Sequence, residues 1–486
     1  MAAKQFIKST FLLSASLALV RISGMALRVC LAAKMGEEGV GVYQMMLSVF
    51  LPASTVVTAG VGIAVTRLVS ARLARGQGAR DILRFSFLWC AGIALMVSAS
   101  LFISAGAISR GMLHNAAAAR GVRILSAGLP FIAVSAAAGG GFLATGKVRA
   151  LCATQILEQA VRIALTVLLI SRFPPADRPL AACIGNTAAE IVSCLAVALW
   201  LWADVRRAAL PSPSAKTDVS RSFLPIVLPI AASKGLTGSL HATENLLIPA
   251  RAALYYGDRD RAVAGFGALK GMALPLIMFP SSVLSTISSL LLPELTAAFA
   301  LRRHDKIISL TQKTLRITWI LSVGVGGAFF RFARPAGRIL YHSETVGDIL
   351  SVLAFTVPFI YLDLIVDGLL KGVGEQVACL RYNVADAAVR IALSFFLLPR
   401  FGIPGFLAVM VVSNIGVSLL ETRRLLSVTG ARLRPLPLLL PPAAATAAYL
   451  LSRLIPGEGV PAVLLAGVLF TAVYLLFLLP LLQTKR

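Results

Sequence analysis

The chain has 486 residues, of which 58% are hydrophobic and only 14% are charged, and its mean hydropathy is +0.85. Such a composition leaves too few polar residues to cover a water-soluble fold. It predicts an all-α polytopic membrane protein, because lipid forces each spanning segment to satisfy its own backbone hydrogen bonds. The net charge of +25 does not indicate nucleic-acid binding, since the basic residues are dispersed among the loops and form no basic domain.

The residues that usually carry catalysis or bind metals form no motif. The six cysteines all fall inside apolar segments, without the CxxC spacing of a metal site, and are interpreted as small core residues. The four histidines have no ligand spacing, and the sequence contains no Walker motif for ATP. We therefore expect no catalytic residue, no metal and no cofactor, and predict that the chain is not an enzyme.

Apolar windows separated by Pro, Gly and charged residues predict fourteen transmembrane helices. The first is expected to be an uncleaved span and not a secretory signal, because Arg21 and Arg28 interrupt its apolar run. In chain order the helices are predicted at 9–33, 40–66, 85–108, 122–143, 150–171, 180–203, 222–250, 263–295, 314–333, 347–370, 378–399, 403–422, 436–452 and 460–482.

These helices predict four parts of the chain. They are an N-lobe of six helices at 1–205, a cytoplasmic linker at 206–221, a C-lobe of six helices at 222–430, and two further helices at 431–486. Lys and Arg are more frequent in the loops on the side of the N-terminus, which places both termini in the cytoplasm by the positive-inside rule. The expected location is the bacterial cell membrane.

An internal repeat relates the two lobes. Shifting the sequence by 228 residues aligns Pro130-Phe131-Ile132 with Pro358-Phe359-Ile360, and Val161–Leu165 with Val389–Leu393. Six helices are an even number, so the second copy starts on the same side of the membrane as the first. The repeat predicts two parallel lobes, an architecture typical of transporters. Features present in both lobes are interpreted as scaffold, and features present in one lobe as candidates for function.

Two ionisable pairs occur in both lobes. Glu158 and Arg162 lie four residues apart in one predicted helix, and their counterparts Asp386 and Arg390 do the same in the other lobe. Residues at this spacing share a helix face and neutralise each other. We interpret both as structural salt pairs.

The first helix of each lobe carries basic residues seven positions apart. These are Arg21 and Arg28 in one lobe and Lys234 and His241 in the other. Seven residues are nearly two turns, so each pair shares a face. Two such faces predict a cationic substrate-binding cavity. The alternative is that the arginines reach the membrane surface or pair with carboxylates.

Four further ionisable residues lie within predicted spans, where burying a charge is costly unless it serves a function. Lys270 has an apolar counterpart in the other lobe and joins the cationic candidates. Asp363 and Asp367 are the acidic candidates for binding a coupling ion, although Asp367 also has Lys371 one turn away as a partner. Glu244 is the third acidic candidate, and pairing with His241 is its alternative role.

Several segments resemble one known family. They are Arg21–Arg28, Gly36–Met45, Ala64–Val69, Glu244–Arg251, Gly271–Leu276 and Val389–Leu393. Together they resemble the stage V sporulation protein B family of polysaccharide flippases, within the superfamily that contains multidrug extruders and the lipid II flippase.

The resemblance implies fourteen helices in two lobes and outward movement of an undecaprenyl-pyrophosphate-linked glycan, lipid II for spore cortex or cell wall being the expected substrate. In the related lipid II flippase, cavity arginines of the first helix are important, which implies that role for Arg21 and Arg28. Expected partners are this polyprenyl-diphosphate-linked glycan, membrane lipids and cell-wall synthases. The alternatives are a cation-coupled multidrug exporter and a membrane scaffold for cell-wall synthesis that transports nothing.

Overall fold

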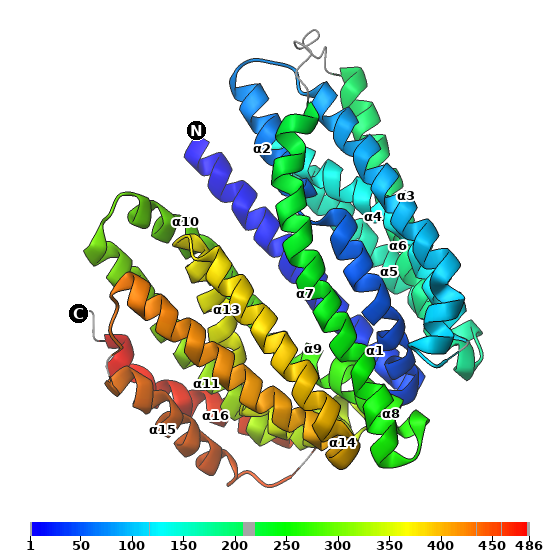
Figure 1. Cartoon of the computed structure of the whole chain (residues 1–486). Coiled ribbons are helices and arrows are strands. Elements are labelled where there is room, and N and C mark those ends of the chain that lie inside the picture. Colours follow the sequence, from blue (N-terminus) through cyan, green and yellow to red (C-terminus); the bar gives the residue numbers. More distant parts are fainter. Residues whose placement is uncertain (1, 116, 208–218, 434, 458, 484–486) are drawn as a thin grey trace. The chain divides into compact units, whose positions relative to one another are not determined.

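The structure is a computed structural model that describes residues 2–115, 117–207, 219–433, 435–457 and 459–483 (Figure 1). Within these ranges every regular element is a helix. The first elements along the chain are α1 (Ala2–Thr58), α2 (Val61–Ala74), α3 (Arg80–Gly111), α4 (Ala118–Ala144), α5 (Val148–Arg172), η1 (Pro175–Asp177), α6 (Arg178–Arg207) and α7 (Val219–Tyr256).

The remaining elements begin after α7. They are α8 (Arg259–Phe266), the π-helical segment η2 (Gly267–Ala273), α9 (Leu274–Met278), α10 (Ser281–Ala300), α11 (His304–Tyr341), α12 (Glu344–Ala354), α13 (Val357–Gly372), α14 (Gln376–Thr429), α15 (Pro435–Ser452) and α16 (Val460–Gln483). The all-helical membrane fold predicted from composition is confirmed.

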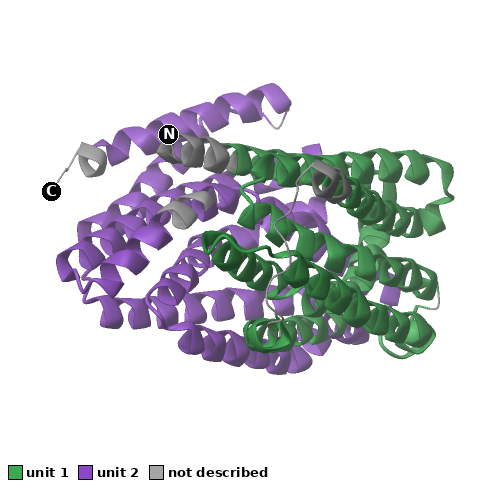
Figure 2. Ribbon diagram, turned by 90° about the horizontal axis from the view of Figure 1, so that it is seen from above, with its two compact units in different colours: residues 1–246 green, residues 247–486 purple. Residues whose placement is uncertain are grey.

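The chain divides into two compact units, residues 1–246 and 247–486 (Figure 2). The division falls inside α7, so the beginning of that helix belongs to the first unit. Most of the predicted linker, 208–218, lies outside the described residues. The predicted four-part organisation of the chain stays a prediction.

Two glycines with positive φ divide the longest helices. Gly36 in α1 has a φ of 69° and Gly402 in α14 a φ of 60°, a region that L-residues with side chains rarely adopt. Each glycine separates two of the predicted spans. The described residues contain 11 helices that are long and apolar enough to cross a membrane, or up to 12 when one bent pair is counted as a span, with the stretch 15–74 and α14 each counted once. The count of fourteen therefore stays a prediction.

Three predicted spans are interrupted in the structure. The span predicted at 40–66 is broken at Gly60, whose φ of 78° starts α2. The span predicted at 263–295 is divided among α8, η2, α9 and α10. The span predicted at 347–370 consists of α12 and α13, which are bent by 60° relative to each other.

The bend between α12 and α13 has a local cause. Pro358 is the second residue of α13. A proline ring clashes with the carbonyl group four residues earlier, here that of Ala354, and α12 ends at that residue. Hydropathy does not register such a break, because the residues on both sides of it are apolar.

Close packing of α2 against α4 in the first unit depends on Gly140. A Cβ atom at Gly140 would lie 2.7 Å from the carbonyl oxygen of Gly62 and 3.0 Å from Cβ of Val65. The Thr66 hydroxyl donates a hydrogen bond to the Gly140 carbonyl at 3.0 Å. Small residues allow such backbone approach between membrane helices.

We expect Gly140→Ala to lower the stability of the protein by about 1 to 3 kcal/mol, since the added methyl group meets backbone atoms that must move. Gly92→Ala in α3 is the matched control, because a Cβ there meets no atom within 4 Å. Thermal unfolding in detergent measures both changes. Equal melting temperatures for the two variants would contradict the packing argument.

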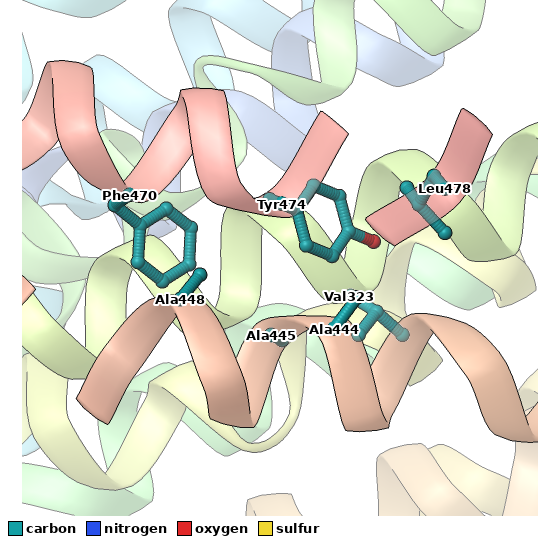
Figure 3. Packing of buried hydrophobic residues seen from close by; sticks show 7 residues of the cluster. All are labelled: Val323, Ala444, Ala445, Ala448, Phe470, Tyr474 and Leu478. Atoms are coloured by element: carbon teal, nitrogen blue, oxygen red, sulfur yellow. The ribbon is translucent and has the colours of Figure 1, made fainter. Parts of the chain in front are cut away.

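In the second unit, α15 and α16 pack on α11 through an apolar cluster. Its buried members are Val323, Ala444, Ala445, Ala448, Phe470, Tyr474 and Leu478 (Figure 3). The Tyr474 hydroxyl, which a lipid environment would leave unsatisfied, donates a hydrogen bond to the carbonyl of Ile320 at 2.6 Å. The two C-terminal helices are therefore an integral part of the second unit.

Candidate functional site

Two arginines of α1 are exposed although they lie in an apolar helix. Arg21 and Arg28 are seven residues apart and precede the kink at Gly36. Helix geometry places them on one face. The guanidinium groups cannot rest against lipid hydrocarbon without a large cost, so arginines exposed on an apolar helix are typical of a face that water reaches.

The α7 segment of the same unit carries the other predicted basic residues. Lys234 is exposed, and the His241 side chain is 65% exposed. His241 Nδ1 lies 3.8 Å from Oε2 of Glu244, whose side chain is only 1% exposed. Glu244 therefore lies close enough to His241 for the pairing that was considered as its alternative role. Lys234 is a further exposed cation of the first unit.

Small residues bring α7 against α1. A Cβ on Gly235 would lie 3.3 Å from Val56, and one on Gly238 would lie 3.7 Å from Cα of Pro52. These contacts involve the part of α1 that follows the kink at Gly36. The arginine pair and Lys234 thus come from different helical segments of a single unit.

The first unit also contains a charged triad between α5 and α6. Arg162 Nη2 lies 2.6 Å from Oε1 of Glu158 and 2.8 Å from Oε1 of Glu190. The three side chains are between 13% and 24% exposed. Glu190 is absent from the predicted set. The repeat register would have singled it out, because its counterpart at position 418 is a serine.

Lys270 lies on the π-helical segment η2 of the second unit and is half-buried. Its Nζ atom is 5.5 Å from the centre of the Phe406 ring, and the guanidinium carbon of Arg390 is 5.9 Å from the same ring. Short π-helical segments occur frequently at functional sites. The predicted partner of Arg390, Asp386, accepts a hydrogen bond from the Ser413 hydroxyl.

An acidic cluster formed by Asp363, Asp367 and Glu421 lies between α13 and α14 of the second unit. Asp367 pairs with Lys371 one turn later on α13. The Asp363 carboxyl interacts electrostatically with Glu421, which is completely buried. Asp363 and Asp367, the two residues predicted as candidates for binding a coupling ion, thus belong to the same cluster. Glu421 was missed, although the repeat register places it opposite Ser193 and so marks it as a charge of one lobe only.

Comparison with known proteins identifies relatives along most of the chain. Residues 6–228 match the model of a family described as polysaccharide biosynthesis protein. The chain is 26% identical to stage V sporulation protein B of Bacillus subtilis over 435 residues, which are 87% of this chain and 83% of that protein. It is 20% identical to the sporulation protein YkvU of the same organism, over 81% of this chain and 88% of the relative. The predicted family resemblance is confirmed.

Solved structures show the same fold. The lipid II flippase MurJ in an inward closed conformation matches with a TM-score of 0.75 and 13% identity, covering 96% of this chain and 98% of that chain. An inward-facing multidrug resistance MATE family transporter matches with a TM-score of 0.68 and 16% identity, covering 85% and 99%. The protein is a multi-pass membrane protein with a transporter fold, and its relatives of this fold are transporters and not enzymes.

Proposed function

We propose that this protein, as a relative of the polysaccharide biosynthesis family, is a flippase that moves a polyprenyl-diphosphate-linked glycan from the inner to the outer leaflet by alternating access. Lipid II is the proposed substrate. The observation that carries the proposal is the set of exposed cations, Arg21, Arg28 and Lys234, within apolar helices of one unit. His241 and Lys270 are proposed as secondary contacts.

A diphosphate needs this kind of site. It carries more than one negative charge and loses hydration when it enters the membrane region. One unit-charge pair at about 4 Å contributes about 4 kcal/mol at an effective dielectric constant near 20, before the cost of desolvation. Three such contacts would offset part of that cost, while the prenyl chain stays in lipid. Arginine also binds phosphate oxygens with two parallel hydrogen bonds.

A second function has two observations in its favour. The acidic cluster of the second unit is the type of site that binds cations, and a multidrug resistance transporter shares the fold. In our proposal this cluster serves coupling, with Asp363 and Asp367 taking part in ion binding and Glu244 as a further candidate. In the alternative it serves the export of cationic drugs.

A reconstituted assay separates the two functions. The purified full chain is placed in vesicles that contain fluorescent lipid II, and access of the headgroup to an outer reagent is followed over time. Parallel vesicles contain a fluorescent cationic drug. We expect movement of lipid II well above protein-free vesicles and no transport of the drug. Drug movement without lipid II movement, or movement of neither, would overturn the proposed function.

A further inference from the structure

Three groups able to bind a metal ion converge in the second unit. They are a carboxylate oxygen of Asp367 on α13, the Sγ atom of Cys379 near the start of α14, and a carboxylate oxygen of Glu421 near the end of α14. All three ligand atoms lie within 4.8 Å of one another. A tetrahedral ion with ligand bonds of about 2.0 to 2.3 Å requires separations of roughly 3.3 to 3.8 Å. An ion bound there would draw the three ligand atoms closer together.

The burial of Glu421 shows that its carboxylate needs a proton or a bound cation. Its side chain is 0% exposed, and neither carboxylate oxygen accepts a hydrogen bond from an N–H or O–H group among the described residues. Asp367 uses one oxygen for Lys371, while its Oδ1 atom is buried with no hydrogen-bond donor in the described part of the chain. Buried carboxylates without donors are costly unless they take up a proton or bind a cation.

The charges around the three groups lead to the same requirement. Asp363, Asp367 and Glu421 together carry three potential negative charges, and Lys371 supplies one positive charge through its pair with Asp367. Asp363 lies beside Glu421, so these carboxylates repel each other when both are charged. A cation bound by Asp367, Glu421 and the Cys379 thiol, which donates to the backbone carbonyl of Asp367, would relieve that repulsion.

We propose that Asp367, Cys379 and Glu421 form a binding site for a divalent ion of the zinc class. The mixed set of one sulfur and two oxygen ligands determines this choice, because thiolate ligands select zinc-like ions over sodium, magnesium or calcium. The ion displaces the proton of the Cys379 thiol. Water takes the fourth position through the side of Asp367, which is 25% exposed. Asp363 lies beside Glu421 and outside this ligand set.

Such an ion would join three helical segments. Asp367 belongs to the last turns of α13, while Cys379 and Glu421 lie on opposite sides of the kink at Gly402 in α14. The site therefore connects α13 with both parts of α14. This inference does not depend on which substrate is transported, because none of its ligands is a proposed substrate contact; it shares Asp367 with the proposed coupling site.

Cadmium binding to the full-length protein tests the site directly. The protein is purified in detergent, stripped with a chelator and titrated with Cd²⁺, whose bond to a thiolate gives an ultraviolet charge-transfer band. We expect one Cd²⁺ per chain and a band that is lost in Cys379→Ser. The control Cys90→Ser, at an equally buried cysteine of the first unit, keeps the band. A band that persists in Cys379→Ser, or no band in the wild type, overturns the proposal.

A second measurement separates ligand loss from misfolding. Glu421→Gln keeps the shape of the side chain, and its melting temperature without metal reports whether the protein is folded. We expect Zn²⁺ to raise the melting temperature of the wild type, and the apparent affinity to fall by at least about tenfold in the folded variant. Equal zinc stabilisation in both proteins contradicts the site. Carboxylic acid infrared bands without any metal binding would show that the cluster holds only protons, which also overturns it.

Discussion

Outward movement of lipid II in reconstituted vesicles is expected to fall by at least about 100-fold when both Arg21 and Arg28 are replaced by glutamine. Each arginine is proposed to make charge-assisted hydrogen bonds to the diphosphate. Such a bond contributes about 1.5 to 3 kcal/mol, so two of them contribute about 3 to 6 kcal/mol. Since about 1.4 kcal/mol corresponds to a factor of ten, the lower limit already exceeds a 100-fold change. The initial rate of headgroup exposure measures the effect.

The controls separate local binding from general charge. Arg120 and Arg149 are exposed arginines near the starts of α4 and α5, and replacing both by glutamine changes the net charge of the protein equally. We expect this control to transport at nearly the wild-type rate. Lysine at positions 21 and 28 keeps the charge without the planar guanidinium fork and is expected to retain partial activity. A folded double glutamine variant with wild-type rates would refute the role of the pair.

Replacing Arg162 by methionine is expected to lower the free energy of unfolding by about 3 kcal/mol. Arg162 contacts both Glu158 and Glu190, at 2.6 and 2.8 Å, in a setting where all three side chains are mostly buried. Without the guanidinium group, two carboxylates face each other in a medium of low dielectric constant. Removing one partner of a buried ion pair costs about 3 to 5 kcal/mol. Unfolding of the purified protein in mild detergent measures the loss.

A compensated variant tests the origin of that loss. Combining Arg162→Met with Glu158→Gln and Glu190→Gln removes all three charges, and we expect most of the stability to return. Recovery would assign the effect to the unpaired carboxylates. If the single variant loses less than about 1 kcal/mol, or if the triple variant is no more stable than the single one, the triad is not the scaffold element that the structure indicates.

The hydropathy of the sequence predicted most of the helices but missed their interruptions. Gly60 and Pro358 each end a helix within an apolar stretch, and η2 changes helix type without any change of hydropathy. Hydropathy reports whether a residue prefers lipid, and both sides of each break prefer it. Only the backbone geometry of the folded chain shows where a span bends.

Pairs of opposite charge could be predicted from the sequence where both residues lie close together along one helix. Glu158 with Arg162 and Asp367 with Lys371 have the spacing of one helical turn, and the structure places both pairs in contact. Glu190 is 28 residues from Arg162, so no helical periodicity relates them. Glu421 lies near Asp363 only because α14 packs along α13. The sequence offered one indication of its importance, since the repeat has no charged residue at the corresponding position of the other lobe.

The sequence by itself determined that this is an all-helical membrane protein, because the hydropathy of a segment is a local property that needs no partner. It also determined the resemblance to a transporter family and the faces that carry Arg21 and Arg28, since helix periodicity places residues seven apart on one side. The tertiary structure decided which charges meet: Arg162 with a second carboxylate, and Asp367 with Cys379 and Glu421. These contacts join distant segments, and their geometry arises only when the helices pack.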